Sequence, residues 1–488
     1  MKLLLRLAAG SLAALLATSV LHAAGGAAEE TASTLDPLVA RLLKDGDVPG
    51  LSLALVRDGK VALVRSWGVR DASGSAPVTE DTIFEAASLS KPVFAYAVLK
   101  LVDAGQIDLD APVAKYLPGE YVEDPRLRAV TVRRVLTHTT GFPNWRPSGQ
   151  PLKIQLDPGE RFSYSGEGFV YLQKAVENAT GQTLETLARR LVFEPLGMKD
   201  TSYSWQERFE GRKARGHDEM GTPRTLRRPA EANAAASLHT TARDYGRFLA
   251  AILSRTGLRK ETLAEMERSQ IQVDEACQNC VTGKPSGRLS KELGWGLGWG
   301  IERTEDGTAI WHWGDNGGSG FHCFVEGYPD RRLGVVIFTN GTGGHGIIPE
   351  VLTAAIGGRH PSTAWLDYER WDSPARTWFK DIAARGEPAV AEYRERKRSD
   401  PAAALKEPQV NRVGYQLLSR KKLPEAIAVF EMNVADFPSS WNVHDSLGEA
   451  YAAAGQREKA IASYEKSLEL NPSNTSGADQ LRKLKAGS

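Results

Sequence analysis

Cysteine is scarce in this chain, which has only three among 488 residues. Three cysteines cannot form the framework of a small disulfide-rich protein, and a chain of this length can bury a large core without one. Charge of one sign is also lacking, because 61 Lys and Arg residues face 60 Asp and Glu residues. This balance gives no support for a nucleic-acid-binding protein, which normally carries a basic patch. The 41% hydrophobic and 25% charged residues are typical of a globular protein.

Several signatures of other enzyme classes are missing as well. The nine histidines form no H-E-x-x-H run, which disfavours a metallohydrolase. No G-x-S-x-G occurs, which argues against a hydrolase with a nucleophile elbow. Cys277 and Cys280 form one C-x-x-C, but without a second pair we expect no zinc site. We favour a local disulfide after export, with Cys323 left over and buried in a strand.

Long hydrophobic runs are absent except at the N-terminus. Lys2 and Arg6 flank the start of an apolar stretch, Leu3–Val20, and a Leu-His-Ala site that ends at Ala23 follows. This order is typical of a secretory signal peptide cleaved near Ala23. The alternative is an uncleaved membrane anchor, but the stretch is short and interrupted by Gly and Ser. We therefore predict an exported mature protein, periplasmic or secreted, with no transmembrane span.

The C-terminal part repeats itself with a period of 34 residues, which is the period of the tetratricopeptide repeat. The recurring pairs are Gly414 and Gly448, Ala426 and Ala460, Phe430 and Tyr464, and Pro438 and Pro472. The alternative is a charged helical tail with chance spacing. Because a stable array usually needs three repeats, we expect a third hairpin or a capping helix, and Ala478–Leu484 suits a cap.

The stretch between these ends mixes strand and helix patterns. Leu51–Arg57 and Val61–Trp67 are apolar runs joined across Asp58-Gly59, which predicts a hairpin. Four more strand-like runs follow later: Leu297–Glu302, Thr308–Trp313, Phe321–Val325 and Leu333–Thr339. Helical patterns lie between the two groups: Lys91–Asp103, Thr183–Val192 and Ala242–Leu253. Because short connections join antiparallel neighbours, we predict an α+β body, an antiparallel sheet flanked by helices with an inserted helical lobe, followed by an all-α repeat tail.

Ser88 and Lys91 form an S-x-x-K pattern at the start of a predicted helix. Positions three apart share one face of a helix, so Lys91 is expected beside the Ser88 hydroxyl. A serine needs a neighbouring base to become a nucleophile, and the field at a helix N-terminus favours developing negative charge. Taken alone the pattern is weak, because Ser88 could be a simple helix cap and Lys91 a solvated lysine.

Two further stretches carry candidate chemistry. Tyr164 lies among small residues, and a phenol buried near a lysine could have a lowered pKa and relay protons. The run His312-Trp313-Gly314 ends a predicted strand. The backbone N–H groups of Asp315 and Ser88 could then form a two-donor oxyanion hole. We assign His138 and His239 structural roles. Three tryptophans could line the cleft, but we favour core packing for them: Trp145, Trp295 and Trp299.

Together and in this order, the three stretches resemble those of the serine β-lactamase and penicillin-binding-protein-like superfamily, in its class C β-lactamase, esterase and D-aminopeptidase branch. The resemblance covers roughly Leu51–Gly341 and implies the fold predicted above. It implies that Ser88 is the acyl-accepting nucleophile, Lys91 its base or proton shuttle, and Tyr164 the proton donor to the leaving group. The strand edge formed by His312, Trp313, Gly314 and Asp315 would bind the substrate.

Two departures from the family pattern bear on the substrate. Gly166 stands where the family often has the Asn of Tyr-x-Asn, so an amide that would contact the substrate is missing. His312-Trp313 stands where it often has the Lys-Thr of Lys-Thr-Gly, and an ordinary histidine is mostly neutral at pH 7. Both changes weaken recognition of an acylamino-carboxylate such as a penicillin, but leave the acylation machinery intact.

The resemblance therefore implies an exported serine hydrolase that cleaves a small-molecule ester or a peptide through a Ser88 acyl-enzyme, with no cofactor and no metal. The alternative is a catalytically weak binding protein whose repeat tail contacts a protein partner. No nucleic-acid partner is expected. The predicted limits are a signal peptide over residues 1–23, a hydrolase domain over 24–360, a helical linker over 361–406 and the repeat region over 407–488.

Overall fold

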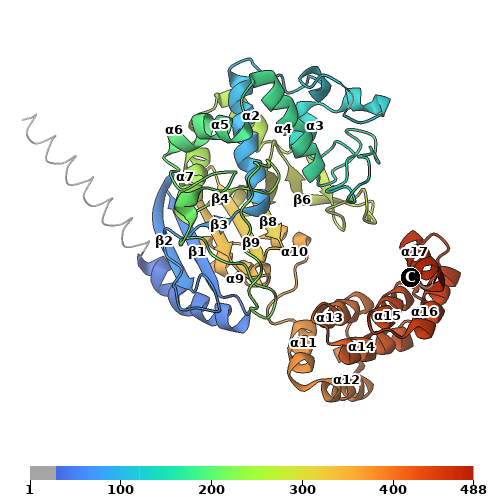
Figure 1. Ribbon diagram of the computed structural model, residues 1–488. Coiled ribbons are helices and arrows are strands. Elements are labelled where there is room, and N and C mark those ends of the chain that lie inside the picture. The colour runs from blue at the N-terminus through green and yellow to red at the C-terminus, as the bar shows by residue number, and fades with distance from the viewer. Residues whose placement is uncertain (1–28, 120, 487–488) are drawn as a thin grey trace, which may run out of the picture. The chain divides into compact units, whose positions relative to one another are not determined.

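The computed structural model describes residues 29–119 and 121–486, so the predicted signal peptide lies outside the described residues. The chain divides after Tyr368 into two compact units. Figure 1 shows a sheet with helices in the first unit and a succession of helices in the second. In the described part of the chain, no helix combines the length and the apolar character needed to cross a membrane.

An eight-stranded antiparallel sheet forms the centre of the first unit, in the order β2-β1-β10-β9-β8-β7-β6-β5. Its strands are β1 Gly50–Arg57, β2 Lys60–Gly68, β5 Ile271–Asp274, β6 Leu289–Trp295, β7 Gly300–Thr304, β8 Gly307–Asn316, β9 Phe321–Tyr328 and β10 Leu333–Thr339. The register places Leu51 of β1 opposite Thr339 of β10. The two ends of the unit therefore share one sheet, as the short connections predicted.

The predicted hairpin and the four later strands are confirmed, with one correction of bounds. β7 begins at Gly300, not at Leu297, because a turn in which Gly296 donates to the Trp299 carbonyl precedes it. The sequence did not predict β5 or β6, since polar residues dominate the exposed half of β6. A separate pair of two-residue strands joins β3 Phe84–Glu85 to β4 His239–Thr240.

Helices cover the sheet and form the inserted lobe. Helix α7 (Ala242–Leu253) matches its predicted bounds and packs on β1, β2 and β10, and α9 (Gly344–Ile356) packs on β9 and β10. Thr241 caps α7 by accepting from the Asp244 N–H. Between β3 and β4 lie α2 Ser90–Asp103, α3 Val132–Leu136, α4 Gly166–Thr180, α5 Leu184–Ala188 and α6 Glu194–Leu196, and α8 Lys260–Glu267 follows α7 (Figure 1). The predicted helix Thr183–Val192 is α5 continued by a π-helical turn.

Up to residue 486, the regular elements of the second unit are all helices. They are α11 Pro374–Arg385, α12 Glu387–Ser399, α13 Glu407–Ser419, α14 Leu423–Asp436, α15 Trp441–Ala453, α16 Arg457–Leu470 and α17 Thr475–Ala486, while α10 Pro361–Leu366 belongs to the first unit. A Cβ on Gly414 would lie 2.5 Å from the Phe430 ring, so the glycine lets two helices of one repeat approach closely. The side chains of α11 and α12 share one apolar core with those of α13 and α14. A further hairpin and a final helix thus accompany the two repeats.

Candidate active site

Ser88 and Lys91 meet where a short 3-10 turn (η1, Ala87–Leu89) enters helix α2. Ser88 therefore lies in the turn before the α-helix, not in the helix itself. Ala87 has a φ of 48°, a left-handed conformation that alanine rarely adopts and that is often found at functional sites. The Lys91 Nζ donates to Ser88 Oγ at 3.0 Å and to the Ala235 carbonyl at 2.8 Å. The two side chains are thus within proton-transfer distance.

Lys91 is fully buried. Burial lowers the pKa of its amine well below the ordinary value of 10.5. Removal from water disfavours the ammonium form, and the hydrogen bonds of Lys91 to Ser88 Oγ and the Ala235 carbonyl go to neutral oxygens. The environment therefore favours a neutral amine, which can accept the Ser88 proton.

Tyr164 lies on the segment that leads into α4, with its ring against three neighbours. The Lys91 Nζ is 4.8 Å from the ring centroid, and the His138 and Trp313 rings are 4.3 and 4.6 Å away. Burial raises the pKa of Tyr164, although the nearby Ser88 hydroxyl acts in the opposite direction. The expectation of a lowered pKa is therefore wrong, because a buried phenolate is costly and Lys91 is itself disfavoured as a cation.

His138 is a residue of this site that the sequence assigned only to structure. It accepts at its carbonyl from the Ser163 N–H (2.8 Å) and at Nδ1 from the Ser165 N–H (3.0 Å), so it holds both neighbours of Tyr164. Its φ is 54°, and burial lowers its pKa well below the ordinary value. The signal in the sequence that could have found it is the run Leu136-Thr137-His138-Thr139-Thr140-Gly141, in which small hydroxyl residues surround the histidine.

The end of β8 forms an open strand edge beside the Ser88 turn. β7 pairs with β8 no further than Trp311, so in the described structure the run His312-Trp313-Gly314 has no partner in β7. A Cβ on Gly314 would lie 2.6 Å from the Ala86 carbonyl, which shows how closely this edge approaches the turn. His312 is fully buried, and burial together with nearby Lys91 lowers its pKa to about 3. It is therefore neutral at pH 7.

Asp315 is held by side chains that the sequence did not single out. Its carboxylate lies 3.2 Å from the His322 Nε2 and accepts from the Tyr368 hydroxyl at 2.8 Å. Burial alone would raise the pKa of Asp315, but these contacts hold it below its ordinary range. The His345 Nε2 donates to the Gly314 carbonyl at 3.0 Å. These groups fix the backbone from which the Asp315 N–H would act.

Trp145 takes the space beside Gly166. A Cβ on Gly166 would lie 2.7 Å from the Trp145 ring, and the Gly166 N–H donates to the Asn144 Oδ1 at 2.9 Å. Trp145 is 48% exposed, so its expected core position is wrong, whereas Trp295 and Trp299 are fully buried as expected. An asparagine at position 166 would therefore collide with Trp145 unless the ring moved.

A cavity of about 440 Å³ adjoins this group of side chains. Trp145, Arg227, Glu231, Ala236 and Asn316 are among the residues that line it. Ala236 follows the residue whose carbonyl holds Lys91, and Asn316 follows Asp315 at the end of β8. The cavity is thus placed to receive part of a molecule that reacts at Ser88, and it offers both charged and aromatic surface.

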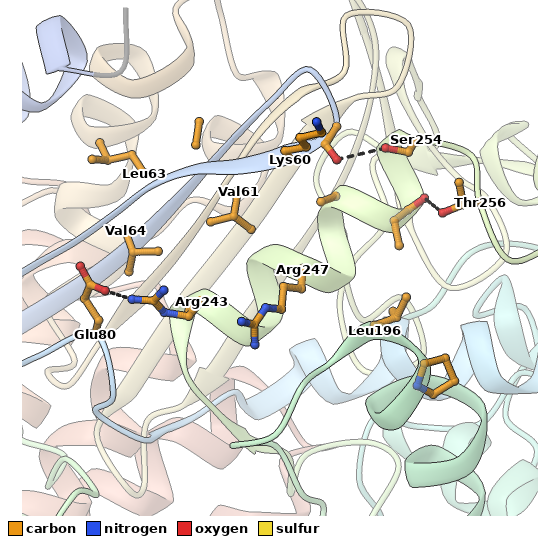
Figure 2. A pocket seen from close by; sticks show the side chains of 15 residues that line it. Lys60, Val61, Leu63, Val64, Glu80, Leu196, Arg243, Arg247, Ser254 and Thr256 are labelled. Atoms are coloured by element: carbon orange, nitrogen blue, oxygen red, sulfur yellow. Dashed lines mark hydrogen bonds and ion pairs between the residues drawn. The ribbon is translucent and has the colours of Figure 1, made fainter. Parts of the chain in front are cut away.

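A larger cavity of about 720 Å³ lies elsewhere, between the edge strand β2 and helix α7. Figure 2 shows Val61 and Val64 on one side, Leu196 on another, and Arg243 paired with Glu80. None of the candidate catalytic side chains lines it. No candidate catalytic side chain lines the smaller cavity either, but Ala236 and Asn316 on its wall directly follow Ala235, which accepts from Lys91, and Asp315, so the smaller cavity lies nearer to them.

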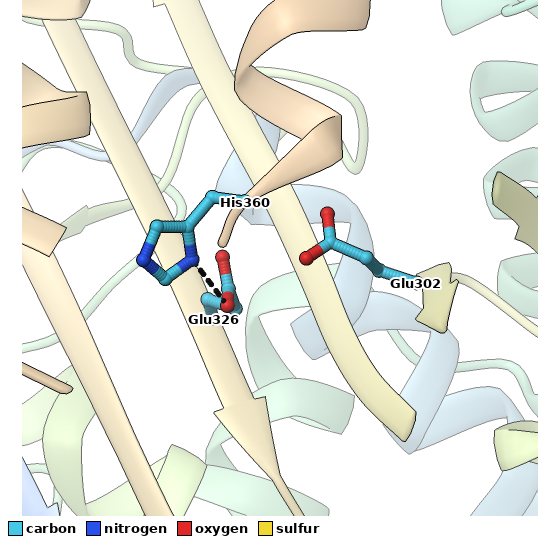
Figure 3. Close-up of side chains that lie close together, drawn as sticks. All are labelled: Glu302, Glu326 and His360. Atoms are coloured by element: carbon cyan, nitrogen blue, oxygen red, sulfur yellow. Dashed lines mark hydrogen bonds and ion pairs between the residues drawn. The ribbon is translucent and has the colours of Figure 1, made fainter. Parts of the chain in front are cut away.

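Among the described residues, one group could supply metal ligands: Glu302, Glu326 and His360, all buried (Figure 3). The His360 Nδ1 lies 2.8 Å from a Glu326 oxygen, and the Ser362 N–H donates to Glu302 at 2.7 Å. In a tetrahedral zinc site with bonds of about 2.1 Å, two ligand atoms lie about 3.4 Å apart. The His360 and Glu326 atoms, 2.8 Å apart, are closer than that and are at hydrogen-bond distance instead. Burial and the neighbouring Glu326 raise the pKa of Glu302 to about 8, so the Glu302 carboxyl holds a proton at pH 7.

Known proteins are similar to this chain over most of its first unit. The family model described as Beta-lactamase matches residues 35–354, most of the first unit. This chain belongs to the β-lactamase family. A tetratricopeptide-repeat model also matches residues 441–474, in the second unit. The β-lactamase-family chain is therefore a member of a group of serine hydrolases, with repeats appended.

Relatives of this β-lactamase-family protein include an esterase and a penicillin-binding protein. Esterase EstB of Burkholderia gladioli is 29% identical over 371 residues, which cover 64% of this chain and 91% of the esterase. Penicillin-binding protein 4 of Amycolatopsis lactamdurans is 32% identical over 219 residues, 41% of this chain and 56% of that protein.

Among solved structures, a class C β-lactamase superposes with a TM-score of 0.57 at 19% identity, covering 68% of this chain and 98% of the other. D-alanine carboxypeptidase AmpC of Burkholderia cenocepacia gives 0.55 at 22% identity, with coverage of 68% and 99%. These structures show the shared fold.

Proposed function

We propose that this protein is a serine hydrolase that cleaves an ester or amide bond through an acyl-enzyme on Ser88, with esters as the preferred class. The observation that carries the proposal is the 3.0 Å contact between the Lys91 Nζ and Ser88 Oγ, with Lys91 buried. A buried amine of lowered pKa is a general base, because it accepts a proton near neutral pH. A simple helix cap would not need a lysine desolvated at this cost.

Acylation begins when Ser88 Oγ attacks the carbonyl carbon of the substrate and its proton passes to the Lys91 amine. The carbonyl oxygen becomes an oxyanion, which the backbone N–H groups of Ser88 and Asp315 stabilise. The open edge of β8 and its close approach at Gly314 support this placement. The strained φ of Ala87 is consistent with a backbone arranged for these donors.

The leaving group departs when the bond between the carbonyl carbon and its oxygen or nitrogen breaks. It needs a proton at that moment, and Tyr164 donates one and regains one from the Lys91 ammonium. A raised pKa suits this role, because it keeps the phenol protonated at neutral pH. A water molecule then attacks the acyl carbon, Lys91 takes its proton, and the acid is released with Ser88 restored.

Three features support esters over penicillins as the substrate class. The relative with the widest coverage of those described is named an esterase. Gly166 and Trp145 leave no side-chain amide at the place of the family asparagine. His312 is neutral, so the third motif supplies no fixed cation for a substrate carboxylate. The 440 Å³ cavity beside Trp145 and Arg227 suits a substrate with an aromatic or polar acyl group.

The direct test is intact-mass measurement after exposure to a fluorophosphonate and to benzylpenicillin, followed by steady-state hydrolysis of aryl esters. We expect one adduct with the fluorophosphonate, mapped to Ser88 and absent in Ser88→Ala, and faster turnover of esters than of benzylpenicillin. Labelling of another serine, or an unlabelled protein without esterase activity, contradicts the proposal. The second outcome would favour the alternative, a weakly reactive binding protein.

Export and the role of the repeats belong to the same proposal. We propose cleavage near Ala23 and an exported hydrolase domain over residues 24–360, and a disulfide between Cys277 and Cys280 is consistent with an oxidising compartment. Cell fractionation with N-terminal mass analysis tests this point. A protein that keeps its first residues in the cytoplasmic fraction contradicts it.

We propose that the repeat region over residues 407–488 binds a protein partner and does not contribute to chemistry. Since α11 and α12 share a core with α13 and α14, a cut after residue 406 would expose Val390 and Tyr393, whereas a cut after Tyr368 separates the two units. Chain 1–368 should hydrolyse a small ester within about twofold of the full chain. A large fall in kcat for chain 1–368 contradicts an independent interaction module.

A further inference from the structure

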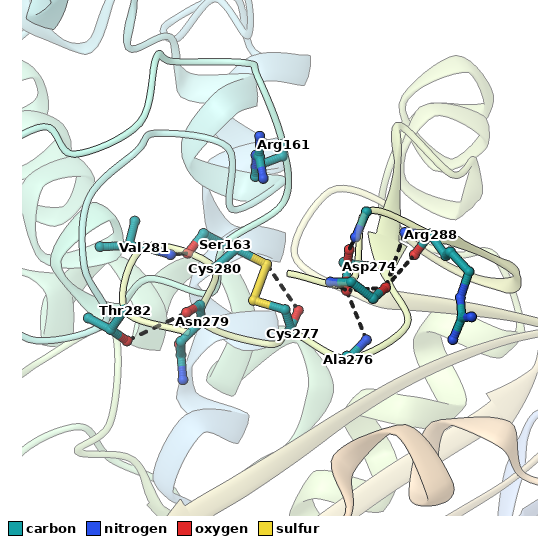
Figure 4. The surroundings of a disulfide bond; sticks show 12 residues. Arg161, Ser163, Asp274, Ala276, Cys277, Asn279, Cys280, Val281, Thr282 and Arg288 are labelled. Atoms are coloured by element: carbon teal, nitrogen blue, oxygen red, sulfur yellow. Dashed lines mark hydrogen bonds between the residues drawn. A yellow bond between two sulfur atoms is a disulfide. The ribbon is translucent and has the colours of Figure 1, made fainter. Parts of the chain in front are cut away.

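The disulfide between Cys277 and Cys280 lies on the backbone that holds Tyr164. The Gln278 carbonyl, inside the four-residue ring, accepts from the Tyr164 N–H at 2.9 Å. The Val281 N–H, directly after the ring, donates to the Ser163 Oγ at 3.0 Å. Figure 4 shows Ser163 and Val281 together beside the sulfur atoms. Two adjacent residues of the tyrosine segment thus depend on the disulfide loop.

This loop has no regular secondary structure and is held by hydrogen bonds at its ends and by the disulfide. Residues 275–288, between β5 and β6, contain no helix or strand. At one end the Asp274 carboxylate accepts from the N–H groups of Ala276, Ser286 and Gly287. Beside the ring, the Gln278 side-chain amide donates to the Trp365 and Leu366 carbonyls of α10. The covalent bridge closes the turn from which the Gln278 carbonyl accepts from the Tyr164 N–H, and the Gln278 side chain anchors that turn to α10.

Tyr164 is therefore held from two sides. His138 binds the backbone of Ser163 and Ser165 on one side, and the disulfide loop binds Tyr164 itself and the Ser163 hydroxyl on the other. The Tyr164 ring is packed against its neighbours, but its hydroxyl has no hydrogen-bond partner of good geometry among the described residues, so the position of the hydroxyl depends on the backbone that carries the ring. A displacement of about 1 Å at such a group can cost about a hundredfold in rate.

We propose that the Cys277–Cys280 disulfide is a positioning element for Tyr164, and that the hydrolase reaches its full rate only while this bond is closed. The inference rests on the proposed function of Tyr164. Opening the bond requires a reductant of the dithiol class: the reagent gives two electrons and two protons, both cysteines become thiols, and the reagent closes to its own cyclic disulfide. The activity then depends on the thiol redox state of the surroundings.

The first experiment compares wild type with Cys277→Ser/Cys280→Ser on a small aryl ester. We expect kcat to fall at least about tenfold while KM changes less than about threefold, because proton delivery is lost and binding is not. Lys284→Ala is the matched control, since this exposed side chain lies in the same loop and outside the contacts described. Dithiothreitol should slow the wild type and leave the double variant unchanged. An unchanged kcat in the folded double variant overturns the proposal.

If the double variant does not fold, a second experiment tests on the wild type whether activity depends on the disulfide. Wild type is titrated with dithiothreitol, and the thiols of quenched, unfolded samples are counted by maleimide mass shift, one before reduction and three after it, because Cys323 is buried in the folded protein. The remaining activity should follow the fraction that is still oxidised and return on treatment with oxidised glutathione. Constant activity with three free thiols overturns the proposal, and so does a loss that re-oxidation does not restore.

Hydrogen exchange separates a failure of this inference from a failure of the proposed function. The Tyr164 amide should exchange faster after reduction, because its acceptor, the Gln278 carbonyl, is released. This readout needs no catalysis. Faster exchange in a protein that hydrolyses no ester supports the positioning and refutes the proposed function, whereas an ester hydrolase with unchanged exchange and unchanged kcat refutes the positioning.

Discussion

The two sides of the active site are built in different ways. On the helix side, Ser88 and Lys91 are three residues apart and one turn places them together. On the tyrosine side, Tyr164 meets His138 from 26 residues earlier and Gln278 from 114 residues later. The helix side is therefore set by local geometry, and the tyrosine side by packing between distant segments. Substitutions should act through chemistry on the first side and through position on the second.

The largest effect is expected on the helix side, for Lys91→Met. Losing the base should lower kcat/KM at least about a thousandfold, a loss within the range of a general base. The fold should tolerate the change, because a buried amine is replaced by an apolar chain of similar length. Steady-state kinetics and thermal unfolding measured together check both statements. A simultaneous loss of activity and stability would mean that Lys91 also stabilises the lobe. The helix side would then act through position as well as through chemistry.

The same variant has a pH signature. The pKa of Lys91 is lower in the folded than in the unfolded state, so the unfolded chain binds more protons between the two values. The stability of the wild type should therefore rise, relative to Lys91→Met, as the pH approaches 10. Its kcat/KM should fall on the acid side, where Lys91 becomes protonated. Thermal midpoints at pH 7 and pH 10 provide the measurement.

A smaller effect is expected on the tyrosine side, for His138→Ala. The variant removes the ring stacked on Tyr164 and the acceptor for the Ser165 N–H, and places alanine at a φ of 54°. We expect kcat to fall about tenfold to a hundredfold with KM nearly unchanged. His138→Asn is the matched control, because asparagine tolerates this φ and offers an amide acceptor. Equal activity of wild type and His138→Ala would show that the ring does not position Tyr164.

The same contrast explains how much could be predicted from the sequence. The S-x-x-K pair could be recognised because its geometry is that of one turn, and the short connections predicted that strands from both ends of the unit share one antiparallel sheet. The contacts of Tyr164 could not be predicted from the sequence, since neither His138 nor the 275–288 loop is near it in the chain. Strand β6 was missed because its first half is exposed and polar. Trp145 was placed in the core on its apolar character, although it covers Gly166 at the surface.

A moderate effect is expected where the two sides meet the substrate, at Gly166 and Trp145. Gly166→Asn alone should lower ester hydrolysis, because its Cβ would lie 2.7 Å from the Trp145 ring. Trp145→Ala removes that obstacle, so the double variant should recover ester hydrolysis and acylate benzylpenicillin faster than either single variant, by about tenfold. Acylation rates from intact-mass time courses provide the test. Additive losses in the double variant would show that the ring does not occupy the place of the missing amide.

The smallest effect on activity is expected from Glu302→Gln, a change in the sheet away from both sides of the site. Burial beside Glu326 raises the pKa of Glu302 to about 8, above its unfolded value near 4.3. The folded state therefore binds a proton more tightly, and the stability from this group is complete below pH 4 and is lost as the pH rises toward 8 and beyond.

Glutamine resembles the protonated acid at every pH, so the two proteins should unfold at similar temperatures at pH 5. At pH 9 the variant should unfold at a temperature higher by about 3 °C or more. Glu326 and Glu292 are the charged groups that act on Glu302, and His360 lies 2.8 Å from the Glu326 carboxylate. Calorimetry at the two pH values measures it, and kcat should stay within about twofold. A midpoint difference that is equal at pH 5 and pH 9 would show that Glu302 is not held protonated by its surroundings.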